Sequence, residues 1–352
     1  MRTSLDEFLK ELQEVNTFVD SVSSVYSTLA KYGDDCITNS LTLRRRLDYL
    51  SFIIALYTSL EKYIEDLAWS FASIESSRNR YTQLHENLQN KHLKKSAELL
   101  FRGRLGEGRY TGLTNKDIVS NLNECLQNSD GYKLNRHAVV FHESNIRSEV
   151  VQGIFQAVGI ENINAKACQT DLLKDWFSTT MGFEDASENN LVKIIDLRLR
   201  DLVDRRNQLV HAGPSSLEAF DPDLMKERLG FFEAYGRAIF NVVGSCYLGR
   251  YYIVNSLANS FGKTTEGPYK NDSVVVIENP RCKIFQGQPV LGIRENKVVR
   301  WGKIIGIQVD NASVNSIEAD SSTSSVGLEL DFKLWKNIQL FGLEKKDEAI
   351  WE

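Results

Sequence analysis

One segment of the sequence combines residue types that can cleave RNA without a metal ion. Arg206 and His211 enclose four residues, and Asn207 follows the arginine directly. A histidine with an ordinary pKa near ~6.5 can take and return a proton at neutral pH, and a guanidinium can hold two phosphate oxygens. In such a reaction a ribose 2′-hydroxyl attacks the adjacent phosphorus, the histidine is general acid or base, and the arginine neutralises developing charge. The segment predicts a ribonuclease site that spares DNA, which has no 2′-hydroxyl.

The spacing alone is not specific, because two other pairs in the chain are similar. Arg80 and His85 also enclose four residues, and Arg136 and His142 enclose five. For both pairs we expect ordinary solvated surface side chains. The segment that begins at Arg206 differs because an asparagine follows the arginine, apolar residues lie inside the segment and a helix end follows it.

Helices must position this segment, because apolar residues recur at steps of three and four over the first two thirds of the chain. Asp221-Pro222 is a typical helix start, and the apolar face that follows extends to Phe261. The predicted helices cover residues 3–31, 43–73, 145–160, 171–181, 189–212 and 222–261.

The chain changes character after Gly262. Short β-branched runs between residues 273 and 341, separated by Gly, Pro, Asn and Asp, predict strands. We therefore expect a mainly α protein, with a helical domain at 1–262 and a small, barrel-like β domain at 272–344. The aromatic residues of the β domain are expected mainly in its core, with base stacking or protein binding as alternatives: Trp301, Phe332, Trp335 and Phe341.

The charge balance restricts where a nucleic acid can bind. The chain has 42 Lys and Arg against 47 Asp and Glu, a net charge of −5. No overall positive field attracts a polyanion, so an RNA-binding surface must be local. A basic insertion around residues 75–135 predicts such a surface, with a solvated charged helix as the alternative. The candidate substrate-binding residues are Lys94, Lys95, Arg102 and Arg104 of the insertion, and Arg205 beside the motif.

Several other features point to an intracellular protein. The cysteines are far apart, form no CxxC pair and have no histidine at metal-ligand spacing, which predicts buried thiols. The segment Met1–Glu7 turns acidic at once, so it is not a signal peptide, and no stretch approaches the ~20 apolar residues of a membrane helix. We expect a cytoplasmic protein with no metal and no cofactor. The cysteines are Cys36, Cys125, Cys168, Cys246 and Cys282.

The motif and an earlier helix together resemble the HEPN superfamily, in particular RiboL-PSP-HEPN-like ribonucleases of prokaryotic defence loci. Arg206 and His211 match the family's R-x4-6-H motif. The segment from Arg44 to Leu67 is similar to an earlier core helix in which an acidic residue after a leucine faces the motif, and Glu61 matches that position. The resemblance covers roughly residues 40–75 and 190–260.

The resemblance implies a helical bundle that dimerises so that two motifs meet in one cleft. It implies catalytic roles for Arg206 and His211, with Asn207 and Glu61 as supporting polar residues. On an ideal helix, positions five apart differ by ~140° around the axis and ~7.5 Å along it, so one chain cannot readily hold one phosphate with both side chains. A twofold partner can supply the missing half. Each residue also has a structural alternative: His211 caps the helix, Arg206 pairs with a nearby aspartate, and Glu61 closes an unrelated ion pair.

These observations predict a metal-independent endoribonuclease that cuts RNA, such as tRNA or phage RNA, at a site shared by a homodimer. The expected role is an antiphage defence or toxin effector with an operon-encoded regulatory partner. The alternative is a noncatalytic HEPN-like dimeric sensor or scaffold that binds a partner protein, which would explain the acidic net charge. A metal-dependent nuclease or a nucleotidyltransferase is not favoured, because the sequence has neither a suitable Asp/Glu group nor a phosphate-binding glycine loop.

Overall fold

The chain folds into two compact units. The computed structural model describes all residues except 30, 32–34, 103–104, 183–187, 213–220, 296, 319–324 and 352, and excludes the side chains of 35–39, 102, 109 and 209–212. One unit consists of Met1 and residues 3–240, and the other of Arg2 and residues 241–352. The first is helical and the second contains a β-barrel, which confirms the predicted fold class.

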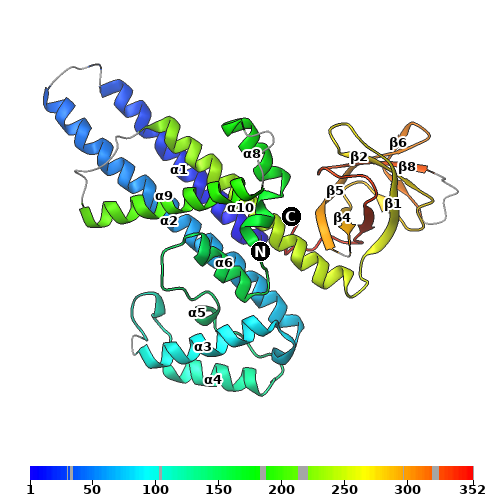
Figure 1. Ribbon diagram of the computed structural model, residues 1–352, viewed down its shortest axis with the longest axis horizontal. Helices are drawn as coiled ribbons and strands as arrows, with labels where there is room; N and C mark the ends of the chain where they lie inside the picture. Colours follow the sequence, from blue (N-terminus) through cyan, green and yellow to red (C-terminus); the bar gives the residue numbers. More distant parts are fainter. Residues whose placement is uncertain are drawn as a thin grey trace. The chain divides into compact units, whose positions relative to one another are not determined.

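The helical unit contains four long helices and several short ones (Figure 1). The periodicity located the long helices and the short helix at 171–181, and placed a shorter helix correctly within 145–160. The helices are α1 (Arg2–Leu29), α2 (Asp35–Arg78), α3 (Glu86–Arg102), α4 (Asn115–Leu126), α5 (Arg136–Val139), α6 (Ser148–Ala157), α7 (Ile163–Cys168), α8 (Asp171–Met181), α9 (Glu188–Ala212) and α10 (Pro222–Leu248), with 3-10 turns at Tyr81–Gln83 and Gly108–Tyr110.

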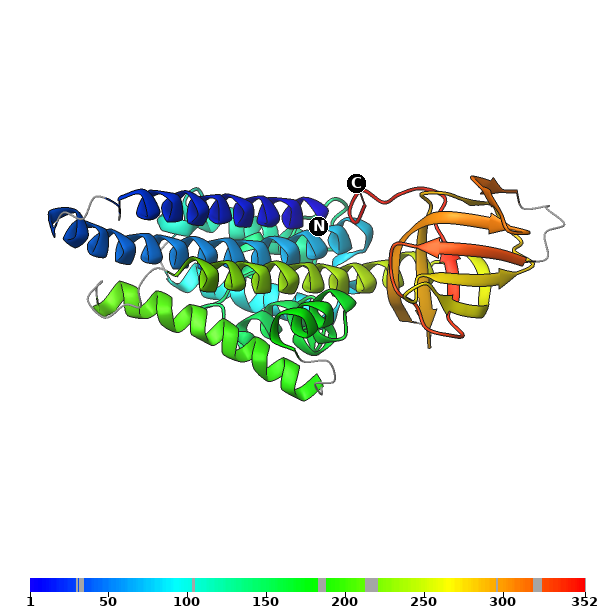
Figure 2. The ribbon, with the colours of Figure 1, turned by 90° about the horizontal axis from the view of Figure 1, so that it is seen from above.

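The central bundle is held by close aromatic packing between α1, α2 and α10, which lie side by side in Figures 1 and 2. The ring of Phe8 stacks on Tyr63 with centroids 4.4 Å apart. The buried hydroxyl of Tyr63 donates to the carbonyl of Gly236 at 2.7 Å. A Cβ at Gly236 would lie 2.5 Å from the Phe8 ring, so only glycine permits this close approach of α10. The packing fixes α2 along its length, and α9 packs against α2 as well.

The predicted basic insertion forms a module of α3, α4 and α5 beside the second half of α2 (Figure 1). Its small core contains Leu99, Ile118, Ala138 and Phe141. A buried histidine, His92, is hydrogen-bonded beside this core. The module therefore has its own apolar and polar interior.

The start of α10 confirms the sequence prediction, but its end does not. The carboxylate of Asp221 accepts the backbone N–H of Asp223 at 3.0 Å and of Leu224 at 3.2 Å, which is a helix N-cap. The α-helix ends at Leu248 and continues as a π-helical turn, Gly249–Ile253. The prediction of helix through Phe261 was wrong, because Phe261 is a buried core residue of the first β-strand.

Six antiparallel strands of the C-terminal unit close into a barrel in the order β4-β9-β1-β2-β8-β5, with β5 returning to pair with β4. In register, Leu291 of β4 lies opposite Phe341 of β9 on one side and Trp301 of β5 on the other. The interior is filled by aliphatic residues such as Val275, Ile304 and Leu328. The strands are β1 (Asn259–Tyr269), β2 (Val274–Glu278), β3 (Ile284–Phe285), β4 (Pro289–Arg294), β5 (Lys297–Val309), β6 (Ala312–Val314), β7 (Ser316–Ile317), β8 (Ser325–Leu330) and β9 (Gln339–Gly342).

Two expectations for buried side chains need correction. Trp335 is 42% exposed, and the Arg300 guanidinium lies 4.4 Å from its ring centre, so this ring is not part of the barrel interior. Phe332 does pack against the core. Of the thiols, Cys125 and Cys168 are buried, but Cys246 and Cys282 are partly exposed. The side chain of Cys36 lies outside the described residues.

Candidate active site

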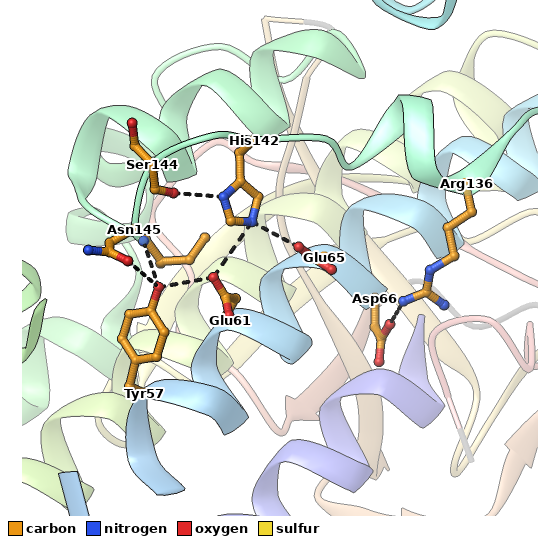
Figure 3. A network of polar contacts seen from close by, with 9 residues as sticks. Tyr57, Glu61, Glu65, Asp66, Arg136, His142, Ser144 and Asn145 are labelled. Atoms are coloured by element: carbon orange, nitrogen blue, oxygen red, sulfur yellow. Dashed lines mark hydrogen bonds and ion pairs between the residues drawn. The ribbon is translucent and has the colours of Figure 1, made fainter. Parts of the chain in front are cut away.

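Polar side chains from three elements meet in the helical unit (Figure 3). Helix α2 provides Tyr57, Glu61 and Glu65 at steps of four residues, which places them on one face of the helix. The segment between α5 and α6 provides His142 and Asn145, which Figure 3 shows facing these three side chains. Helix α9 provides the residues of the predicted motif.

His142 is held between two carboxylates and a carbonyl. Its Nε2 lies 2.8 Å from Glu65 Oε1 and 3.8 Å from Glu61 Oε1, and its Nδ1 lies 2.7 Å from the Ser144 carbonyl oxygen. Burial lowers the pKa of His142, but the hydrogen bonds to Glu65 and Ser144 and the two negative charges outweigh it and raise the pKa overall. The side chain is only 9% exposed. His142 therefore favours the charged form.

Tyr57 connects the carboxylates to the adjacent segment. Its hydroxyl donates to Glu61 Oε1 at 2.9 Å, lies 3.4 Å from Asn145 Oδ1, and accepts the backbone N–H of Ile146 at 3.3 Å. Burial is the largest cause that raises the pKa of Tyr57 to about 12, and Glu61 adds to it. The phenol is therefore neutral at physiological pH and keeps its proton on the side of Glu61.

The motif residues Arg206 and Asn207 adjoin Tyr57. The Arg206 guanidinium carbon lies 5.2 Å from the centre of the Tyr57 ring, a cation–π contact. The Asn207 amide oxygen accepts from Arg206 Nη1 and from Asn145 Nδ2, each at 3.1 Å. In the described part of the chain, no carboxylate lies within ion-pair distance of Arg206, which is half-buried. The expected alternative of pairing with Asp201 or Asp204 is therefore not what holds this guanidinium.

Nearby aspartates are occupied by other arginines. Asp201 receives Arg205 Nε at 2.8 Å and also pairs with Arg228. Arg205 donates in addition to the Tyr49 hydroxyl at 2.9 Å. Burial raises the pKa of Asp201, but the two guanidinium groups of Arg228 and Arg205 outweigh it and lower the pKa overall. Arg205, predicted to bind substrate, is thus engaged in contacts within the bundle.

Asp204 makes a different pair, with Arg147 at 2.7 Å, and both side chains are half-exposed. This pair ties α9 to the start of α6, next to Asn145. The segment 142–147 therefore contacts α2 through His142 and α9 through Arg147.

His211 lies in the last turn of α9, but its side chain is outside the described residues. The same holds for Arg104 and for the side chain of Arg102. Lys94 is exposed on α3. Lys95 pairs with Glu98 at 2.6 Å and lies 4.5 Å from the centre of the Phe141 ring. Of the candidate residues, the structure brings together Glu61, Arg206 and Asn207.

The basic insertion also has an open cleft of about 860 Å³ between the end of α2 and the turn after α4. Its lining includes Trp69, Arg78, Arg80 and Lys133, with Asp130 as the acidic member. Among the charged residues of its lining, three are basic and one is acidic.

The prediction that Arg136 and His142 are ordinary solvated side chains was wrong for His142. Its partners on α2 are 77 and 81 positions away in the sequence, so local spacing gave no indication of them. One signal was present: Glu61 and Glu65 lie one helical turn apart near apolar neighbours, and two such carboxylates require a cation. Arg136 is 43% exposed and pairs with Asp66. The exposed positions of Arg80 and His85 agree with the prediction.

Comparison with protein families gives a match to the helical part of the chain. A family model described as RiboL-PSP-HEPN matches residues 6–245. The match covers about two thirds of the chain, including every residue of the candidate site, so the chain belongs to the RiboL-PSP-HEPN family. This membership indicates a nuclease or another RNA-related function. Searches of curated proteins and of solved structures each gave no match.

Two further searches concern membranes and metals. Among the helices of the described residues, none has the length and apolar character needed to cross a membrane. Within the same part of the chain, no three His, Cys, Asp or Glu side chains are grouped so that they could hold a metal ion.

Proposed function

We propose that the chain is a metal-independent endoribonuclease whose active site contains Arg206, Asn207 and His211. The observation that supports this most directly is the position of Arg206. Its guanidinium is half-buried, rests against the Tyr57 ring and is neutralised by no described carboxylate. A guanidinium that is partly removed from water is stabilised when an anion binds to it, and an RNA phosphate has the right charge and geometry.

The reaction needs no redox partner. A base removes the proton of a ribose 2′-hydroxyl, and the 2′-oxygen attacks the adjacent phosphorus. The bond from phosphorus to the 5′-oxygen breaks, and an acid protonates that oxygen, which leaves a 2′,3′-cyclic phosphate and a 5′-hydroxyl end. Arg206 neutralises the phosphoryl oxygens, and His211 acts in proton transfer. Asn207 and Glu61 act as positioning residues.

We further propose that two copies form the site. The helical offset between Arg206 and His211 separates them around α9, so a second motif would complete one phosphate site. An apolar stripe on the outer face of α2 supports a second copy nearby. Leu43 is 54%, Leu47 44% and Ile54 41% exposed, on the same helix that carries Tyr57.

The basic module, with Lys94, Lys95 and the cleft beside Arg78 and Arg80, would bind the RNA backbone away from the cut. The biological role we propose is an antiphage defence or toxin effector restrained by a regulatory partner in the cytoplasm. Such restraint matters experimentally, because an enzyme of this kind is silent until released.

The test is cleavage of total RNA and tRNA in EDTA, with sequencing of the new RNA ends in cells that express each protein. Arg206→Ala and His211→Ala should each reduce cleavage by about 10²- to 10³-fold, the usual effect of losing an electrostatic or acid–base group. New ends should carry a cyclic phosphate, and a 2′-deoxy substitution at the cut should block cleavage. If wild type and the Arg206→Ala, His211→Ala double variant give identical RNA ends in cells, the chain is instead a noncatalytic sensor or scaffold.

A further inference from the structure

The two glutamates next to the motif pose an electrostatic problem. Glu61 and Glu65 lie one turn apart on α2, and both approach the same atom, His142 Nε2, within 3.8 Å. The side chain of Glu65 is 13% exposed and that of Glu61 is 31% exposed. Two carboxylates at such a site repel each other, and neither is well hydrated. A positively charged group between them relieves this repulsion.

The hydrogen-bond pattern identifies His142 as that cation. Its Nδ1 faces the Ser144 carbonyl, which can only accept, and its Nε2 faces the Glu65 carboxylate, which accepts when ionised. Both ring nitrogens must therefore donate, and a histidine that donates from both is an imidazolium. Because both nitrogens are used and the side chain is 9% exposed, His142 has no lone pair or surface available for RNA.

The other charged groups around this site come from α3. Lys91 is half-buried, and burial together with the charge of Lys95 lowers its pKa to about 8, with Glu65 opposing the shift. Lys95 is paired with Glu98. His142 forms an ion pair with Glu65 at 2.8 Å. The imidazolium is therefore a direct counter-charge of this carboxylate.

The fixed carboxylates lead to the motif through one further residue. Glu61 accepts the hydroxyl proton of Tyr57, and the Tyr57 ring lies against Arg206. On the other side, the segment that carries His142 also carries Asn145, whose amide holds the Asn207 oxygen. Two routes thus connect His142 to the motif, one through α2 and one through its own segment.

We propose that His142 is a positioning residue for Arg206 and Asn207: its imidazolium holds Glu61 and Glu65, and thereby fixes the tyrosine and asparagine that place the two motif residues. This inference rests on the proposed ribonuclease function. It assigns His142 no contact with substrate. Its loss should reduce turnover more than RNA binding, because a displacement of about 1 Å at a reacting group can lower the rate ~10²-fold while most backbone contacts persist.

The experiment compares steady-state RNA cleavage by wild type, His142→Ala, His142→Gln and the control His85→Ala, whose histidine is exposed. We expect kcat to fall about 10- to 100-fold in His142→Ala with KM changed less than about threefold. His142→Gln, which keeps one donor toward Glu65 but no charge, should fall in between. Wild-type kcat should decline on the alkaline side as the His142 imidazolium loses its proton. The part of the decline caused by His142 should be absent in His142→Gln, whereas the part caused by His211 should remain in both proteins. His85→Ala should match wild type.

A second variant keeps the inference testable if His142→Ala does not fold. Tyr57→Phe removes only the hydroxyl that connects Glu61 to the ring under Arg206, and should lower kcat in the same way. In the double variant with His142→Gln, the two effects should be less than additive, as expected for residues in one network. A wild-type kcat and pH profile in both His142→Gln and Tyr57→Phe would overturn the inference. Loss of all Arg206 dependence would instead overturn the proposed function, so the two failures are distinguishable.

The protonation state can also be measured without any activity. Nitrogen NMR of histidine-labelled protein at pH 7 should show His142, assigned by its absence in His142→Gln, with both ring nitrogens protonated. A neutral ring at pH 7 would contradict the inference.

Discussion

The helical unit contains two histidines that are both withdrawn from solvent and yet are held in opposite protonation states. His92 of α3 accepts the backbone N–H of Asn135 at 3.0 Å, so its Nε2 must keep a lone pair. His142 faces the carbonyl of Ser144 and the carboxylate of Glu65, so its nitrogens must both donate. Burial lowers the pKa of His92 to about 4, with a contact to an asparagine oxygen opposing it. For His142 the charged partners outweigh burial and raise the pKa.

The difference shows that the surroundings of a histidine decide whether it stabilises the local fold or holds charged groups next to the candidate site. The Nδ1 of His92 faces the Tyr81 hydroxyl, whose proton goes to the Gln89 carbonyl, so the neutral ring completes a closed network inside the α3–α5 module. His142 instead sits where α2 meets the segment that leads to Asn145 and the motif. A neutral, fully bonded histidine stabilises the local fold. A charged one fixes neighbouring carboxylates.

Acid and alkali therefore act on different histidines. The unfolded state binds a proton near pH ~6.5, before the folded state protonates His92, so stability declines as the pH falls from ~6.5 toward 4. His142 has the opposite sign. Its contribution is complete below pH ~6.5 and is lost as the pH rises through its raised folded pKa.

The largest expected effect is that of His92→Ala on stability. The substitution leaves a cavity at a fully buried position and removes the acceptor of the Asn135 N–H, so the free energy of unfolding at pH 7 should fall by roughly 3 kcal/mol. Urea denaturation followed by circular dichroism measures this. The control His85→Ala should lose less than about 1 kcal/mol, because its imidazole is exposed and accepts one N–H near the start of α3. Equal stabilities for His92→Ala and His85→Ala would show that His92 does not stabilise the fold in this way.

A smaller effect is expected for His142→Gln, and it should depend on pH. At pH 6 the variant should be less stable than wild type by roughly 1–3 kcal/mol, because a hydrogen bond between charged groups is lost. The difference should shrink as the pH rises, since wild type then loses the same charge. Urea midpoints of both proteins from pH 6 to 9 measure this, and titration of Lys91 is common to both and cancels. A difference that grows with pH would contradict the sign argued for His142.

The long helices and the motif could be predicted from the sequence because the patterns that indicate them involve residues close together in the chain. Each helix repeats its apolar residues every turn, and an N-cap such as Asp221 acts within three residues. Glu61 could be chosen because its segment resembles a HEPN core helix in which an acidic residue follows a leucine. Its nearest charged partner could not, because His142 reaches α2 only through tertiary folding.

The barrel shows a second limit of sequence patterns. Strand β1 alternates poorly, with Phe261 and Thr264 buried among glycine, proline and exposed polar residues, so the preceding helical pattern extended into it. Strand β4 is buried along nearly its whole length, so its burial shows no alternation. A short apolar run of this kind has no period of its own, and closure of the barrel determines its conformation.

The smallest expected effect is that of Arg136→Ala. This variant tests whether Arg136 shares the positioning role proposed for His142. Arg136 and His142 both reach α2, but Arg136 is 43% exposed and its partner Asp66 points away from Tyr57 in Figure 3. Loss of an exposed ion pair should lower the free energy of unfolding by less than about 1 kcal/mol, and by less still in high salt. RNA cleavage should keep the wild-type kcat and pH profile. A drop in kcat comparable to that of His142→Ala would mean that positioning of the motif extends along α2 to Asp66.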